Sequence, residues 1–254
     1  MKRIAVILGV GLLTALLPAP ALAQAQTGAV ATRQQDAHWQ AAYRLAQTVR
    51  PEAHAYAEIA RIYDGGAFDA MRQDSDGAAL EAAYPGIVDA ITNSVRDLLT
   101  QDAIDRLPQL WERLADIYAE LPDEDLAVVQ AYYASDAGQH LLQATIARLD
   151  FRPVMSSMVE QEDFTVRPGD MQAMTSRSAM SVLAELSAEE QAALMRFAQT
   201  PAFRKFSVLV TRVQEASAEW ANETSPGLDA RVEKTVADAA TAFMAAADKP
   251  GSKN

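Results

Sequence analysis

The side chains best suited to metal or acid–base chemistry are few and widely spaced in this chain of 254 residues. Its three histidines are His38, His54 and His140, and none belongs to an H-E-x-x-H pattern or has a second histidine four residues away. A zinc site needs several such ligands brought together by a motif of this kind. The sequence therefore predicts no metal site and no chemistry that depends on histidine.

Ser135 lies five residues before His140, a spacing that raises the question of a nucleophile and its base. The chain has no Gly-x-Ser-x-Gly turn, which an α/β-hydrolase would need. At the start of a helix, a serine hydroxyl is committed to the backbone N–H groups of the first turn. We therefore predict that Ser135 is a helix cap.

Two acidic runs, at residues 123–125 and 160–163, are the remaining candidates for acid–base work. Such work needs a cleft that perturbs the pKa values of the carboxyl groups. Solvated faces and helix N-terminal charges account for both runs. The segment Asp74–Gly77 is similar to part of a calcium loop, but a carboxylate is missing at its first and last ligand positions. We expect a turn there.

Almost every segment from Asp36 onward has helical spacing of apolar residues, as in Trp39, Tyr43, Ala46 and Val49. No stretch alternates with a period of two, so strands are not expected. Pro108 falls inside a long apolar stripe and should kink or divide that helix, because proline lacks a donor and crowds the preceding turn. The sequence predicts an all-α fold.

The most informative feature is an internal repeat with a constant offset of 65 residues, which aligns Leu121–His140 with Leu186–Lys205. Four aligned pairs are identical and four are similar: Leu121/Leu186, Glu124/Glu189, Ala127/Ala192 and Ala137/Ala202, then Asp125/Glu190, Val129/Leu194, Tyr132/Phe197 and Ser135/Thr200. Each unit is predicted to be a short helix, a tight turn and a longer helix. The fold is then a bundle of helical hairpins, with repeats at about 121–149 and 186–214.

Local chemistry supports these hairpins. Ser187 with Glu190 predicts a capping box, and Thr200-Pro201 predicts an N-cap followed by a first-turn proline. We expect Tyr132 and Phe197 to face the core. The residues that carry this structural signature are Tyr132, Tyr133, Ser135, Gly138, Phe197, Thr200 and Pro201.

Gly138 stands in the predicted first turn of a helix, where glycine costs roughly 0.5–1 kcal/mol relative to alanine. The second repeat has Phe203 at the equivalent position. We predict that another part of the structure closely approaches the backbone at Gly138.

The N-terminus has the features of a secretory signal. Lys2 and Arg3 precede an apolar run at residues 4–17, and Ala21-Leu22-Ala23 predicts cleavage after Ala23. We expect a signal peptide at 1–23, a flexible leader at 24–35, a helical domain at 36–247 and a disordered tail at 248–254. Residues 150–170, which contain prolines, are the natural boundary between two halves.

Composition excludes several classes of partner and site. Without cysteine, the chain has no disulfide, thiolate metal site or lipid-bearing N-terminal cysteine. The net charge is −12, and removal of Lys2 and Arg3 with the signal makes it −14. An acidic surface repels nucleic acid and anionic membranes. No later segment is long and apolar enough to cross a membrane.

The phrase Leu-x-x-Glu-Asp-Leu at 121–126, followed by Tyr132-Tyr133-Ala-Ser135-Asp-Ala-Gly138, resembles the signature of the bacterial domain of unknown function family 2059. The resemblance covers about residues 95–149 and implies an exported helical protein, with no activity to carry over. The chain departs from the family pattern at Asp136, where the family tends to have proline, and at Tyr132, where it often has phenylalanine.

These observations leave three hypotheses. The first is a noncatalytic periplasmic or secreted protein, without a cofactor, that works by binding or assembly in the cell envelope. The second is a carrier of a small apolar ligand, in a cavity lined by Trp111, Tyr118, Tyr133 and methionines. The third is an enzyme whose dispersed carboxylates converge in a cleft.

Overall fold

A computed structural model describes residues 36–64, 75–154 and 165–247, and the predicted all-α fold is confirmed there. These ranges contain no strand. Their helices are α3 (Ala37–Val49), α4 (Glu52–Asp64), α6 (Ser75–Ala83), α7 (Ile87–Tyr118), α8 (Asp123–Tyr133), α9 (Asp136–Ala147), α11 (Pro168–Leu183), α12 (Ala188–Ala198), α13 (Pro201–Asn222) and α14 (Leu228–Ala247).

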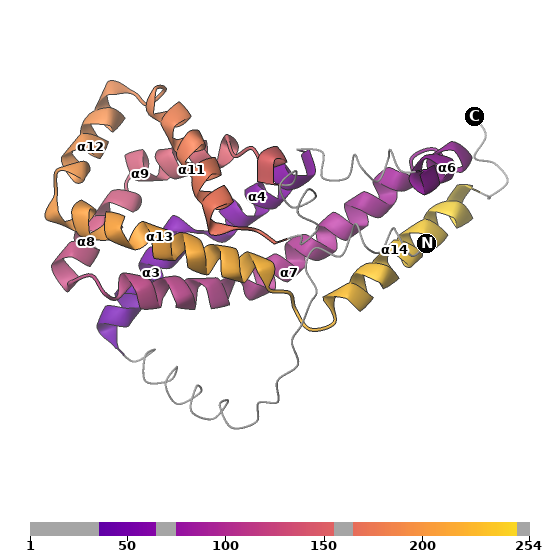
Figure 1. The fold of residues 1–254 in the computed structure, drawn as a ribbon, viewed down its shortest axis with the longest axis horizontal. Helices are drawn as coiled ribbons and strands as arrows, with labels where there is room; N and C mark the ends of the chain where they lie inside the picture. Colours follow the sequence, from indigo (N-terminus) through magenta and orange to yellow (C-terminus); the bar gives the residue numbers. More distant parts are fainter. Residues whose placement is uncertain (1–35, 65–74, 155–164, 248–254) are drawn as a thin grey trace.

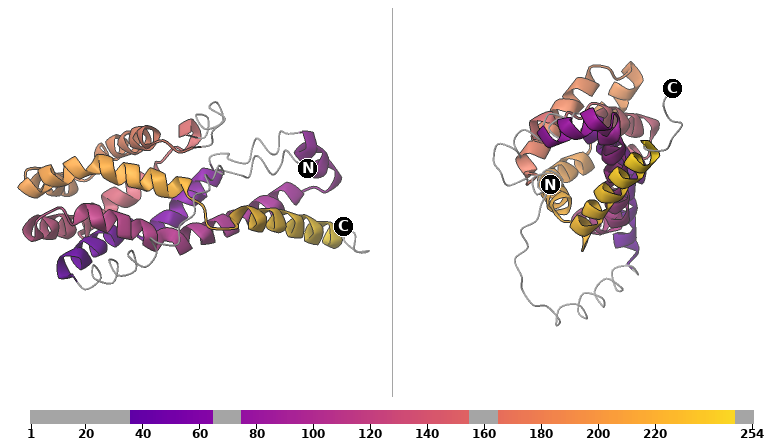
Figure 2. Two further views of the ribbon diagram at one scale, coloured as in Figure 1. Left: turned by 60° about the horizontal axis from the view of Figure 1, so that its bottom comes forward. Right: turned by 90° about the vertical axis from the view of Figure 1, so that its right-hand side faces the viewer.

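Helix α7, with 32 residues, joins two parts of the molecule. Its C-terminal half packs with α3 and α13 in the main bundle, and α8 joins that bundle by packing on α3 and α13. Its N-terminal half packs with α6 and the antiparallel α14, and this arm extends away from the bundle (Figure 1 and Figure 2). The molecule is therefore elongated along α7.

Pro108 lies inside α7 without dividing it, because the helix continues from Ile87 to Tyr118. Figure 1 shows that the axis of α7 changes direction near its middle, as a proline without its N–H donor would produce. Leu107 and Leu110, on either side of Pro108, are buried in the main core. Packing of these side chains holds both halves in one bent helix.

Helix α6 corrects the expectation of a turn at residues 75–77, whereas Asp74 lies outside the described residues. The helix begins at Ser75, so Asp76 and Gly77 belong to its first turn. Serine and aspartate favour helix starts as well as turns, since their side chains can bond to nearby backbone N–H groups and an acidic group suits the helix N-terminus.

The junction between α6 and α7 depends on Gly86 and Glu81. Gly86 has φ +92°, a left-handed conformation that favours glycine. The Glu81 carboxylate accepts hydrogen bonds from the N–H groups of Gly86, at 2.6 Å, and Val88, at 3.1 Å. A carboxylate from α6 therefore caps the start of α7.

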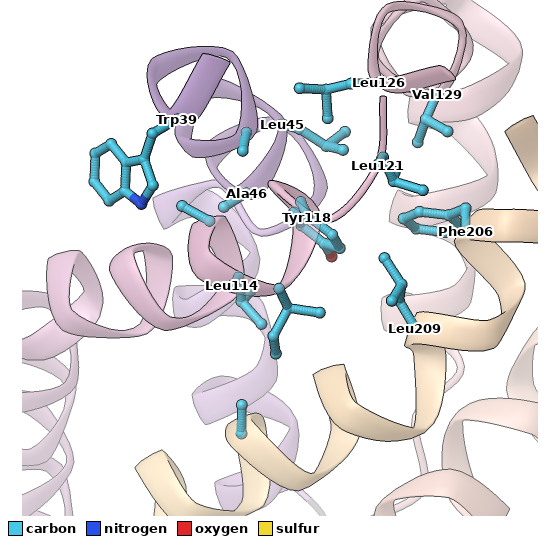
Figure 3. Packing of buried hydrophobic residues seen from close by; sticks show 14 of the residues in the cluster. Trp39, Leu45, Ala46, Leu114, Tyr118, Leu121, Leu126, Val129, Phe206 and Leu209 are labelled. Atoms are coloured by element: carbon cyan, nitrogen blue, oxygen red, sulfur yellow. The ribbon is translucent and has the colours of Figure 1, made fainter. Parts of the chain in front are cut away.

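The main hydrophobic core surrounds Tyr118, of which only 1% is exposed (Figure 3). Leu45, Leu126 and Phe206 reach it from three other helices. The same core contains side chains from both sides of residues 150–170, and α11 packs on both α9 and α13. Helices before and after that segment thus share one core.

The predicted signal peptide, leader and tail lie outside the described residues. Among the helices of the described ranges, none has both the length and the apolar character that a membrane span requires.

Candidate functional site

The predicted caps at the hairpin turns are present. The Ser135 hydroxyl accepts from the Gly138 N–H at 3.2 Å and donates to the Tyr132 carbonyl at 2.6 Å. The Thr200 hydroxyl accepts from Phe203 at 3.0 Å and donates to Phe197 at 2.7 Å. In each hairpin, the hydroxyl thus bonds to a carbonyl near the end of the first helix and to the N–H of the third residue of the second helix. Both hydroxyls therefore have a structural role as helix caps.

The second hairpin also has the predicted capping box at the start of α12. The Glu190 N–H donates to the Ser187 hydroxyl, and the Glu190 carboxylate accepts from the Ser187 N–H at 2.8 Å. The hydrogen bonds from Ser187, together with the nearby His140, lower the pKa of Glu190 to about 2. Pro201 stands in the first turn of α13, as predicted.

Aromatic side chains fill the space between the two hairpins. The rings of Tyr132 and Phe197 stack at 4.1 Å with an interplanar angle of 9°, and both residues are buried, as predicted. The centroid of the Phe206 ring lies 5.6 Å from that of the Tyr133 ring and 5.7 Å from that of the Tyr118 ring. Burial raises the pKa of the Tyr118 and Tyr133 phenols, so both stay neutral at physiological pH.

The predicted close approach at Gly138 is confirmed. A Cβ on this residue would lie 2.2 Å from the Tyr132 carbonyl oxygen and 2.8 Å from the Tyr133 Cα. These are backbone atoms at the end of α8, which cannot move aside as a flexible side chain can. Glycine is therefore required by the first hairpin turn itself.

The histidines lie in three separate contacts. The His38 ring donates to the Ala119 carbonyl at 2.8 Å and bonds to the Asp123 carboxylate, and these two contacts raise its pKa. His140 pairs with Glu190. His54 is buried, and desolvation lowers its pKa, assisted by the nearby Arg50 charge.

A polar corner forms where α3 turns into α4. The Arg50 carbonyl accepts from the Trp111 indole at 2.8 Å, and the Thr48 carbonyl accepts from the Gln139 amide at 3.4 Å. These bonds satisfy carbonyls that a helix end leaves open. Two buried side-chain atoms near this turn, His54 Nδ1 and Gln130 Oε1, have no hydrogen-bond partner.

The acidic run at 123–125 divides between two structural contacts. Asp123 bonds to His38, and the buried Asp125 pairs with Lys205 from α13. The run at 160–163 lies outside the described residues. Within the described ranges, no three histidine or acidic side chains gather as a metal site would require.

The sequence did not point to a buried ionic cluster at the middle of α7. The Asp102 carboxylate, 3% exposed, pairs with Arg106 at 3.1 Å and with Arg231 of α14. Arg106 also lies over the Trp220 ring and donates to the Trp220 carbonyl at 3.0 Å. The i,i+4 spacing of Asp102 and Arg106 was visible in the sequence, whereas the contact with Arg231 was not. The cluster fastens α13 and α14 to α7.

The aromatic side chains expected to line a carrier cavity are part of the packed core. Trp111 stands edge-on to Tyr43, and Tyr118 and Tyr133 pack on Phe206. Met155 and Met158 lie outside the described residues. A shallow groove lies elsewhere, lined by Tyr56 and Ala60 of α4 and by Arg96, Asp97, Thr100 and Gln101 of α7.

Exposed apolar side chains are concentrated on α11, α12 and α13. Met180 and Val208 are 72% and 75% exposed, Met195 is 58% exposed and Leu183 is 42% exposed. These three consecutive helices are in contact, since α13 packs on both α11 and α12. Where such side chains form a contiguous patch, they are typical of protein-binding surfaces.

No family model matches the chain, and neither the curated proteins nor the solved structures include a significant match.

Proposed function

We propose that this chain is an exported, noncatalytic protein of the cell envelope, periplasmic or secreted, that binds a partner protein. The signal-like segment at 1–23 supports export. The resemblance to family 2059 agrees with that compartment, and membership of the family is part of the proposal.

The observation that carries the binding role is the set of exposed apolar side chains on α11–α13, namely Met180, Leu183, Met195 and Val208. The partner fits this surface if its own contact surface is apolar.

Native mass spectrometry of the protein, purified from the envelope of the cells that make it, tests this proposal. We expect the mature chain, starting at Gln24, together with the mass of a bound protein. The complex should persist when the salt concentration is raised, because salt screens charges and leaves apolar contacts in place.

Variants locate the interaction. Met195→Ser with Val208→Ser should remove the partner mass and leave the helical circular dichroism spectrum unchanged, whereas Thr211→Ser on an exposed position of α13 should retain the partner. Loss of the partner only in the first variant supports the proposal. A mature chain that begins at Met1 contradicts export, and a bare chain or an equally bound double variant contradicts the binding surface.

A further inference from the structure

Two ion pairs between the hairpins are related by the 65-residue offset. Lys205 of α13 pairs with Asp125 of α8, and His140 of α9 pairs with Glu190 of α12. Position 140 is equivalent to 205, and position 125 is equivalent to 190. In one pair the first hairpin supplies the acidic residue and the second hairpin the basic one. In the other pair the equivalent positions are used, but the second hairpin supplies the acidic residue and the first hairpin the basic one.

A second set of ion pairs repeats this relation nearer the start of each hairpin. Arg212 of α13 bonds to Glu120 at 2.6 Å, and Arg148, which follows α9, bonds to Glu185. Glu120 and Glu185 are equivalent at the 65-residue offset, whereas Arg148 and Arg212 are 64 residues apart, one fewer than the offset. Because α9 ends at Ala147 whereas α13 continues to Asn222, Arg148 reaches its partner from a helix end.

The stacked rings of Tyr132 and Phe197 occupy equivalent positions. In a symmetric pair, a residue that contacts its own equivalent lies on the twofold axis, and all other contacts occur in reciprocal pairs. The helices follow the same rule, since α8 packs on α13 and α9 packs on α12.

We infer that the α8–α9 and α12–α13 hairpins pair about a local twofold axis between Tyr132 and Phe197, so that each hairpin buries a surface made to recognise a second hairpin of the same kind. The partner of each surface is thus a hairpin with an acidic group at the start of its first helix and a basic group on its second. Opposite charges at these places select the antiparallel, exchanged arrangement and disfavour pairing of like ends.

This inference is independent of the proposed partner protein, and it predicts that the two cations can exchange places. His140 and Lys205 are about half exposed, so the double variant His140→Lys with Lys205→His should fold. Circular dichroism at 25 °C checks the fold. We expect the melting temperature of this double variant at pH 6 to stay within about 2–4 °C of that of the parent. A change of about 1 kcal/mol in the free energy of unfolding shifts the melting temperature by this amount in a chain of this size.

Double-mutant cycles with Glu190→Gln and Asp125→Asn then measure the two contacts at pH 6. In the parent, His140 should be coupled to Glu190, and Lys205 should be coupled to Asp125. In the exchanged variant, both carboxylates should keep a coupling of similar size.

The control exchanges His140 with Lys234, which lies on α14 and pairs within its own helix. This exchange should leave the coupling between Lys205 and Asp125 unchanged. Retention of both couplings in the His140/Lys205 exchange supports the twofold relation. Loss of either coupling in the exchanged variant at pH 6, with an intact fold, would overturn it.

Discussion

The α8–α9 and α12–α13 hairpins share one backbone plan but reach it through different side chains. The first helix of each has 11 residues, and the second helix starts three residues later. The first hairpin has Asp136 and Gly138 where the second has Pro201 and Phe203. The tighter approach of α8 to α9 requires glycine, whereas Phe203 places its ring against Phe197 in the second hairpin.

The starts of the two hairpins also differ. Pro122 provides no side-chain cap for α8, and His38 from α3 holds the Asp123 carboxylate at that end. In α12, Ser187 and Glu190 form a capping box within the helix itself. The comparison teaches that a helix start can be held by a cap within the helix or by a side-chain contact with another helix.

The largest effect should come from the ring that lies between the hairpins. Phe197→Ala should lower the free energy of unfolding by about 3–5 kcal/mol, because it removes a buried aromatic ring and leaves a cavity. Urea unfolding measures the loss. Val208→Ala, at an exposed position, is the control and should change little. A loss below about 1 kcal/mol for Phe197→Ala would contradict a core role.

The next largest effect should come from Gly138, the residue that distinguishes the turn of the first hairpin from that of the second. Gly138→Ala should cost about 1–3 kcal/mol, as overpacking does, because the new Cβ would meet the backbone of Tyr132 and Tyr133. Gly169→Ala is the matched control, since Gly169 is also in the first turn of a helix and has open space around it. Thermal or urea melts compare them. Equal or higher stability of Gly138→Ala would exclude the close approach.

A smaller effect should be the same in both hairpins. Ser135→Ala and Thr200→Ala should each cost about 1 kcal/mol, because each removes the acceptor for an N–H in the first turn of a helix. Urea melts of the single variants and of the double variant measure both costs. A cost in one hairpin and none in the other would show that the two caps are not equivalent.

The smallest effects should have opposite pH dependence at the two hairpin starts. The pKa of His38 is raised, so its contribution to stability is present below about pH 6.5 and is lost as the pH rises through the raised value. The pKa of Glu190 is lowered from 4.5 to about 2, so its contribution is present above pH 4.5 and is lost as the pH falls towards 2.

Melting temperatures of the parent, His38→Gln and Glu190→Gln between pH 2 and pH 9 test this contrast. The deficit of His38→Gln should shrink on the alkaline side, and that of Glu190→Gln should shrink on the acid side. Deficits that stay constant with pH would mean that neither charged form stabilises its helix start. His38 also faces Asp36, so Asp36→Asn serves as a control for general attraction.

The sequence by itself determined the helices of the hairpins and their caps. Ser135, Thr200 and the Ser187–Glu190 pair act on backbone groups within three residues of themselves, so their roles follow from spacing alone. The same local signals misled at Ser75–Gly77, because residues that favour turns also favour the first turn of a helix. The equivalence of the two hairpins as a repeat remains a prediction.

Only the tertiary structure decided which helices meet and which charges pair. Asp102 contacts Arg231 across 129 positions of the chain, and His140 contacts Glu190 across 50. Such contacts depend on the angle and rotation of packed helices, which many distant apolar side chains set together. The spacing of residues along the chain does not predict that geometry. For the same reason, a glycine at position 138 could be marked as unusual from the sequence, while the atoms that require it became known only from the fold.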